Sequence, residues 1–239
     1  MRNPIGAKRL FPGAIAAGVV LVIGAITVPL ICGRDDRPAG TKPAIPAPAP
    51  PPAAAPSGPI SLVHGARVAD GIEVGFPHTP IGAVSAASEY VDAAASTLDP
   101  DYAASVMRVA GDPGNTALPS SLATSILKLR SELQLRSDGP LDRPVTFQTT
   151  AQMYQLRNVA ADDVLVLLLT DSTFVNAQGG TAQTTGVFPV QMRWIAGDWK
   201  IGAIGRTGQD YSSLAATPDT QDAVKRGWLA LIAATGGAS

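Results

Sequence analysis

The sequence predicts an α+β domain in which helices pack on one face of a curved antiparallel sheet, behind an N-terminal membrane helix and a Pro/Ala-rich linker. Three observations predict this class. Residues 81–135 repeat apolar side chains at helical spacing, and residues 145–204 contain alternating and continuously apolar runs typical of strands. Residues 11–31 are apolar and uncharged over a length that matches a membrane core. Helices followed by a run of strands are typical of α+β domains.

The chain divides into a cytoplasmic tip, a transmembrane span, a linker and one outer domain, expected at residues 1–10, 11–31, 32–59 and 60–239. The charges before the span are all positive: Arg2, Lys8 and Arg9. The positive-inside rule therefore predicts a single-pass protein of the cell membrane, with a cytoplasmic N-terminus and an extracytoplasmic C-terminal domain. The alternative is a cleaved signal peptide, which usually has a shorter apolar region and a small-residue cleavage site.

The linker repeats proline and alanine, which favours an extended polyproline conformation and offers too little apolar surface to fold. A passive spacer is the simplest interpretation. Cys32 is the only cysteine, so the outer domain has no internal disulfide. The chain has a net charge of −1 and its outer domain has no basic stripe, which argues against a nucleic-acid partner.

Three helices are predicted near the start of the outer domain. Thr79-Pro80 marks the start of the first, which continues to about Thr97. Asp99 is the expected N-cap of the second, which ends near Gly111. The third is expected from about Ser120 to Leu135. The inward-facing residues of the second helix are predicted to be Tyr102, Val106 and Val109. Ahead of the first helix, the expected strand or packing residues are Val68, Ile72, Val74 and Phe76.

Strands are predicted in the second half. Val145 to Met153 alternates as a half-buried strand does, whereas Val164 to Val175 is nearly continuously apolar, which predicts a strand covered on both faces. A loop is expected at Gly179-Gly180. Thr184 to Ile195 alternates again and the chain returns from Trp199 to Ile204 after a glycine turn, which predicts a β-hairpin.

A final helix is predicted after Asp219. The apolar residues that follow are spaced three or four apart, as on one side of a helix. Its buried side is expected to contain Val224, Trp228, Leu231 and Ile232.

This order of elements resembles the NTF2-like (cystatin-like) cone, a family with helices leading into a strongly bent sheet. The family often has a late pair of strands with a tryptophan on each strand and a glycine in the turn. Here Trp194, Gly197 and Trp199 occupy those places. The resemblance covers about residues 81–204 and implies an NTF2-like outer domain.

The stretch Gly75-Phe76-Pro77-His78-Thr79-Pro80-Ile81-Gly82 also resembles the start of the first helix in membrane-anchored actinobacterial proteins of conjugative and integrative elements. Those proteins are similar in layout to bitopic scaffold subunits of type IV secretion channels. The resemblance implies a non-enzymatic component of an envelope-spanning assembly that contacts other membrane or envelope subunits, or copies of itself. The interaction or family-motif residues are expected to be Gly75, Phe76, His78, Thr79, Gly82, Trp194 and Trp199.

The sequence predicts no catalytic, cofactor-binding or metal-binding residues. A His78–Asp92 pair would suit acid–base chemistry in a small-molecule hydrolase or isomerase. His78 between Pro77 and Thr79 fits better as a cap or staple of the helix start. The other alternative is an outer domain that binds or senses a small apolar ligand inside the cone. Trp194 and Trp199 are either core residues or an exposed aromatic patch.

Overall fold

The computed structural model describes residues 54–141, 144–204 and 209–234. The expected tip, span and most of the linker lie outside these residues. Within the described ranges, no helix combines the length and the apolar character that a membrane crossing needs.

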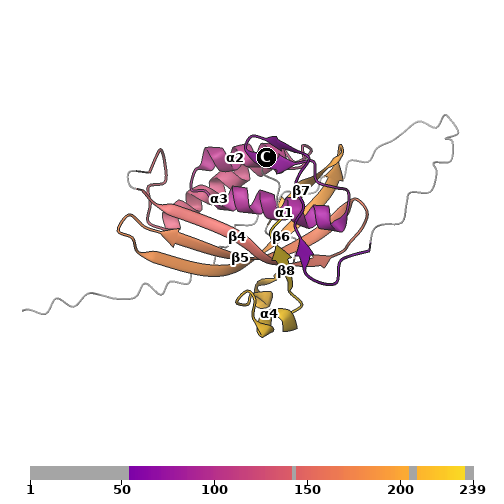
Figure 1. The fold of residues 1–239 in the computed structure, drawn as a ribbon. Helices are drawn as coiled ribbons and strands as arrows, with labels where there is room; N and C mark the ends of the chain where they lie inside the picture. The colour runs from indigo at the N-terminus through magenta and orange to yellow at the C-terminus, as the bar shows by residue number, and fades with distance from the viewer. Residues whose placement is uncertain (1–53, 142–143, 205–208, 235–239) are drawn as a thin grey trace, which may run out of the picture.

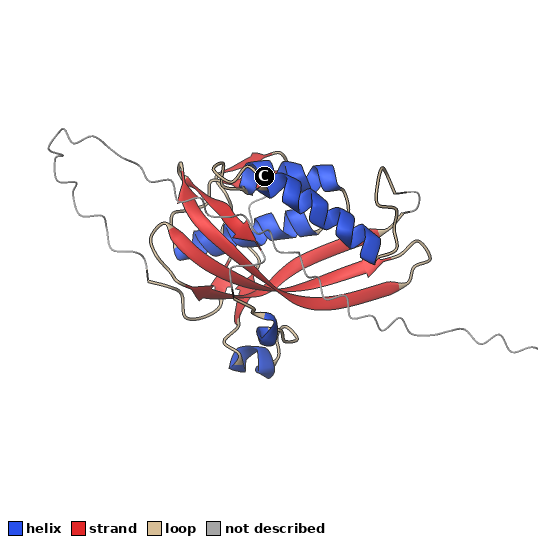
Figure 2. Ribbon diagram, turned by 180° about the vertical axis from the view of Figure 1, so that it is seen from behind, coloured by secondary structure: helices blue, strands red, loops and turns tan. Residues whose placement is uncertain are grey.

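The described residues form a mixed α+β domain around a curved six-stranded sheet with strand order β1-β8-β4-β5-β6-β7 (Figure 1). Helices α1 (Pro80–Ala95), α2 (Pro100–Ala110) and α3 (Leu118–Glu132) cover one face, and the short α4 (Gln221–Lys225) lies on the other (Figure 2). The strands are β1 (Ile60–Ser61), β4 (Thr146–Arg157), β5 (Asp163–Val175), β6 (Thr181–Ile195), β7 (Asp198–Ile204) and β8 (Leu229–Ile232). A separate hairpin joins β2 (Arg67–Ala69) and β3 (Ile72–Val74).

The helix starts are where the sequence predicts them. The Thr79 hydroxyl accepts the Gly82 N–H at 3.0 Å, and the Asp99 carboxylate accepts the Asp101 N–H at 2.9 Å. In both helices a proline in the first turn supplies no donor, which costs nothing at that position. α3 begins two residues before the expected Ser120, because Pro119 also fits a first turn.

β5 is buried on both faces from Val164 to Thr170, as predicted, but Asp171, Thr173 and Val175 in the rest of the predicted strand are only half-buried. Val164, Val166 and Val190 face the main core beneath the helices. Leu165 and Leu167 face the opposite way, into a smaller cluster that contains Trp228. The sheet is therefore the middle layer of the domain over this part of its length.

The predicted β6–β7 hairpin is present. Trp194 pairs with Trp199, and the intervening Ala196 and Gly197 have φ angles of 51° and 84°. Two central residues with positive φ give the turn a twist that matches the flanking strands. The predicted Gly179-Gly180 loop also lies between two strands, β5 and β6.

The predicted final helix is wrong beyond its first turn and a half. α4 ends at Lys225, and Gly227 then adopts a φ of 86° that a helix does not allow. The residues after Trp228 form β8, which pairs with β1 and β4. Of the residues expected on its buried side, Trp228 is buried, whereas Val224 and Ile232 are 62% and 48% exposed.

One expected inward residue is exposed. Tyr102 is 41% exposed, because α2 buries the neighbouring stripe that contains Ala103, Val106 and Met107. Val68, expected as a strand or packing residue, lies in strand β2 and is 68% exposed, whereas the buried side chains of the β2–β3 hairpin come from Ile72 and Val74.

Side chains of α1 and its C-cap bind the edge of β4 that β8 leaves open. The Ser96 hydroxyl accepts the Thr149 N–H at 2.9 Å, and the Asp92 carboxylate accepts the Ala151 N–H at 2.9 Å. Ala151 lies at a shift in the β4–β5 register, where a bulge bends the strand. An uncovered strand edge invites pairing with other chains, and here α1 blocks it.

Asp92 makes the stability of the domain depend on pH. Burial raises the pKa of the Asp92 carboxyl to about 7, Glu89 adds to this, and the Ala151 N–H opposes it. The folded pKa is above the unfolded one, so stability is fully present below about pH 4 and falls as pH rises towards 7. Asp92→Asn keeps the acceptor oxygen without the charge. We expect this variant to be more stable than the natural chain at pH 8 by about 4 kcal/mol, and nearly equally stable at pH 4.

Urea denaturation at the two pH values tests this expectation. Asp101→Asn is the matched control, since it makes the same chemical change at an exposed residue in the first turn of α2. If the Asp92→Asn and natural curves keep the same separation at pH 4 and pH 8, the buried carboxyl does not titrate as described.

Candidate functional site

The structure brings the predicted motif residues together at one end of the sheet, in a cluster called here the aromatic junction: Phe76, His78, Trp194 and Trp199. The His78 ring stacks on Trp194, with centroids 4.1 Å apart and planes 8° apart. Trp199 meets the edge of Trp194 at 5.5 Å. The segment before α1 therefore packs directly on the β6–β7 hairpin, more than 100 residues later in the chain.

Hydrogen bonds fix this junction. The Trp199 indole donates to the Pro77 carbonyl at 2.9 Å, and the Phe76 N–H donates to Asp198 Oδ1 at 3.2 Å. The Tyr90 hydroxyl on α1 donates to the Trp199 carbonyl at 3.3 Å, and burial raises the pKa of that hydroxyl. Trp199 is 1% exposed. Of the two alternatives for the tryptophans, Trp199 is a core residue and Trp194 is half-buried.

Asp198 organises the junction, a role that its position in a predicted turn did not indicate. Its Oδ1 accepts two hydrogen bonds, one from the Phe76 N–H and one, at 2.9 Å, from the N–H of the adjacent residue Trp199. Its Oδ2 lies 3.0 Å from Lys200 Nζ, which also donates to the Val109 carbonyl at 2.8 Å. Asp198 is 3% exposed, so its charge is balanced inside the domain by hydrogen bonds and one lysine.

The small residues of the motif have steric roles. Gly75 has a φ of 79°, a conformation that favours glycine. A Cβ on Gly82 would overlap the Pro77 carbonyl oxygen, the acceptor for Trp199. Thr79 caps α1 beside them. The motif is thus a tight turn that lets the start of α1 reach the hairpin.

Gly82→Ala tests this steric role. Alanine normally stabilises a helix relative to glycine by about 1 kcal/mol. Here the added methyl group would displace the Pro77 carbonyl, so we expect a loss of about 2 kcal/mol in the free energy of unfolding. Urea denaturation followed by tryptophan fluorescence measures it. Gly58→Ala is the control, because a Cβ there meets nothing within 4 Å; a Gly82→Ala chain at least as stable as the natural one would contradict the expectation.

His78 and Asp92 have different partners. His78 Nε2 lies 2.9 Å from the Ala161 carbonyl oxygen and 2.8 Å from Asp162 Oδ1, in the turn between β4 and β5. Asp92 lies about four turns further along α1, roughly 20 Å at about 1.5 Å per residue, and binds β4. His78 therefore staples the helix start to the β4–β5 turn. The sequence had no signal for Asp162.

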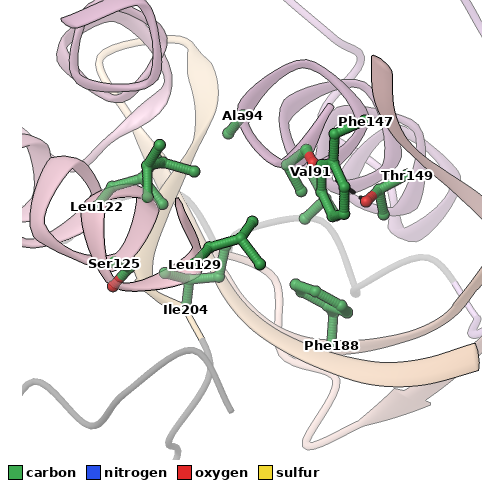
Figure 3. Close-up of a pocket in the computed structure, with 11 residues that line it drawn as sticks. Val91, Ala94, Leu122, Ser125, Leu129, Phe147, Thr149, Phe188 and Ile204 are labelled. Carbon is green, nitrogen blue, oxygen red and sulfur yellow. Dashed lines mark hydrogen bonds between the residues drawn. The ribbon is translucent and has the colours of Figure 1, made fainter. Parts of the chain in front are cut away.

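A small apolar cavity lies between α3 and the sheet (Figure 3). Leu122 and Leu129 line it from α3, and Phe147 and Phe188 line it from β4 and β6. Its volume is about 20 Å³, enough for about one water molecule. Its polar lining groups are engaged elsewhere, since the Ser125 hydroxyl donates to Ser121 and the Thr149 hydroxyl to Ala95.

A second hollow lies at the opposite face, next to Arg157, Tyr211 and Leu214. Its volume is about 260 Å³ and its walls are largely polar and exposed. Within the described ranges, no three His, Cys, Asp or Glu side chains gather as a metal site.

Together, the fold and the site define a class: an α+β domain whose motif residues join its first helix to a late hairpin. The chain belongs to the family described as Domain of unknown function (DUF8175), which it matches over residues 52–225. A comparison with curated proteins finds no match.

Two solved structures are similar to parts of the chain. One is a protein from Xanthomonas campestris described as a calcium/calmodulin dependent protein kinase II association domain. Its sequence is 14% identical, the match covers 59% of this chain and 89% of that chain, and the TM-score is 0.37. The other is the intermembrane space region of the chloroplast protein ARC6, with 15% identity, 51% and 88% covered, and a TM-score of 0.31.

Proposed function

We propose that the protein is a non-enzymatic, single-pass membrane component of an envelope-spanning conjugation- or secretion-type assembly. In this proposal residues 11–31 anchor the protein in the membrane, and the Pro/Ala-rich linker sets the distance between the membrane and the outer domain. The outer domain contacts other membrane or envelope subunits. The N-terminus is cytoplasmic and the domain is extracytoplasmic.

One observation supports this proposal above the alternatives: the motif residues make contacts with other parts of the same domain. The Trp199 indole binds the Pro77 carbonyl just before α1, Thr79 caps α1, and His78 binds the β4–β5 turn. The cavity under α3 has a volume of only about 20 Å³. The outer surface is thus the part of the domain available for recognition.

We also propose that the outer domain is an NTF2-like (cystatin-like) cone. Three helices precede the long strands, the sheet is bent at bulges near Ala151 and Met192, and the hairpin has a tryptophan on each strand. In this proposal the surface of the cone makes the contacts with other subunits.

Crosslinking in the native membrane, followed by mass spectrometry, tests the assembly proposal. The expected result is that the full chain is recovered with at least one subunit of a transfer or secretion apparatus. Recovery of the chain with no such subunit, from membranes in which its neighbours are abundant, would contradict it.

A second candidate function, binding of a small apolar ligand, is favoured by the lining of the cavity. Val91, Leu122, Phe147 and Phe188 surround it, and α3 forms one wall. Binding would require α3 to move outward. The test is a thermal shift of the full chain with small aromatic and aliphatic probes; Leu122→Phe, which fills the cavity, should abolish any shift, and equal shifts in both chains would reject the cavity as the binding site.

A further inference from the structure

The hollow on the face of the sheet away from α1, α2 and α3, called here the polar hollow, forms where the end of β4 meets the segment before α4. Its volume of about 260 Å³ compares with about 20 Å³ for the cavity under α3. Pockets for drug-sized ligands begin at roughly 300 Å³, so the polar hollow has room for one small molecule. The residues that line it are Arg157, Asn158, Gln209, Asp210, Tyr211, Ser213 and Leu214.

A buried glutamine connects the two sides of the polar hollow. Gln155 is 2% exposed, its Oε1 accepts a hydrogen bond from Arg157 Nη2 at 2.6 Å, and its Nε2 donates to the Arg226 carbonyl at 2.9 Å. Arg226 Nη1 in turn donates to the Ser213 carbonyl at 2.6 Å. The Arg157 guanidinium is therefore oriented before a ligand arrives, and the opposite wall is fixed by the same network.

Several polar groups of the lining are available to a ligand. The Asn158 carboxamide and the Ser213 hydroxyl make no hydrogen bond to another described residue. Gln209 Oε1 accepts the Tyr211 hydroxyl at 3.2 Å, which leaves the Gln209 amide hydrogens without a partner in the described part of the chain. Carboxamides and hydroxyls both donate and accept hydrogen bonds. The polar hollow thus offers donors and acceptors side by side.

The charges of the lining cancel. Among the described residues that line the hollow, Arg157 is the one cation and Asp210 the one anion. The two Asp210 carboxylate oxygens accept the Ser212 N–H at 2.9 Å and the Ser212 hydroxyl at 3.1 Å. A phosphate would meet a carboxylate beside the single arginine, and a metal ion would find one carboxylate that is already engaged. This lining favours a neutral polar ligand.

One wall of the polar hollow is aromatic. Tyr211 is half-buried and packs against the apolar cluster that contains Trp228. A sugar ring has hydroxyls that donate and accept, and an apolar C–H face that packs on an aromatic ring. We propose that the polar hollow binds one neutral sugar ring. Arg157, Asn158 and Gln209 supply its hydrogen bonds, and the Tyr211 ring packs on its C–H face.

This site is separate from the surface contacts of the proposed function, because it requires neither a membrane anchor nor another subunit. Two sources offer the same chemistry, a free monosaccharide and one unit of an envelope polysaccharide. A ligand as small as one sugar ring is expected to bind with a Kd of about 1 mM.

Saturation-transfer NMR of the full chain tests the proposal, since it detects weak binding and identifies the bound protons. The probes are glucose, galactose, mannose, arabinose and N-acetylglucosamine. The chain is prepared without sugar-based detergents, because these would compete for the site. At least one probe should give a signal from its ring C–H protons.

Two variants locate the site. Asn158→Gly removes the carboxamide and suits the φ of 49° at that position, so the chain should fold normally. Arg157→Lys keeps the charge but loses the planar group that Gln155 orients. Each should weaken binding at least fivefold. Arg108→Ala is the control, because it removes an exposed arginine from α2 on the other side of the sheet, and it should leave binding unchanged.

The outcomes are distinct. The absence of a signal from all five sugars overturns the proposal, and so does equal binding by the natural chain and an Asn158→Gly chain whose circular dichroism melting is natural. A loss of binding in Arg108→Ala as large as in Arg157→Lys also overturns it. Cosedimentation with insoluble cell-wall polysaccharide then identifies the source: binding to sugar and polymer supports a polysaccharide unit, and binding to sugar alone supports a free monosaccharide.

Discussion

Replacing Asp198 by alanine is expected to lower the free energy of unfolding by about 3–5 kcal/mol. The change would leave Lys200 without its buried counterion and the amides of Phe76 and Trp199 without their shared acceptor. A buried charge that loses its partner is costly, because water no longer solvates it. The chain has 3 tryptophans, all within the described domain, so urea denaturation followed by tryptophan fluorescence reports on it directly.

Two variants calibrate this result. Asp198→Asn keeps one acceptor oxygen for the two amides and loses only the charge, so a smaller loss is expected. Asp138→Ala removes an aspartate whose side chain is 87% exposed, and should change stability by less than about 0.5 kcal/mol. If Asp198→Ala is as mild as Asp138→Ala, the aspartate does not hold the junction together.

Replacing Trp228 by alanine is expected to cost about 3–5 kcal/mol. Trp228 is 1% exposed, and its indole N–H donates to the Leu214 carbonyl at 2.8 Å. It fills the cluster between β5 and the C-terminal segment, which is the only cover of Leu165 and Leu167 that the described residues provide on that face. The segment around Leu214 should become protease-sensitive, since both its packing and its hydrogen bond are lost.

The matched control lies on the same segment. Val224→Ala changes a side chain that is 62% exposed, and should leave both stability and proteolysis nearly unchanged. Urea denaturation and limited proteolysis of the full chain measure the two effects. Equal proteolysis of the two variants would mean that Trp228 does not fasten this segment.

Much of the fold was predictable because its signals are local. Thr79 and Asp99 cap helices through their own side chains, and the turn at Gly197 needs only the conformations of two residues. Continuous apolar character in β5 similarly indicated a strand buried on both faces. Such features depend on neighbours within a few residues, so one sequence is enough to find them.

The largest error concerns long-range pairing. The apolar residues Val224, Trp228, Leu231 and Ile232 are spaced as on a helix, but β1 and β4 provide strand partners for residues 229–232. Gly227 was the local sign that the helix ends. In the candidate site, Trp199 and His78 were identifiable from the resemblance, whereas Asp198 and Asp162 were missed. Their roles depend on contacts between turns that lie far apart in the sequence. Nothing near Asp198 or Asp162 in the sequence indicates those contacts.

The pairing of β1 with β8 has a mechanical consequence. β1 has two residues. Its contacts include the ladder to Leu231 and Ile232, the buried Ile60 side chain and the hydrogen bond from the Tyr154 hydroxyl to the Gly58 carbonyl at 2.7 Å, and the next residue, Leu62, donates its N–H to the Ile232 carbonyl at 2.8 Å. Any pulling force transmitted along the chain before residue 58 acts first on the pairing of β1 with β8. Because β4, β5 and β6 share much longer ladders, the β1–β8 pairing would break under load while the rest of the sheet stays folded.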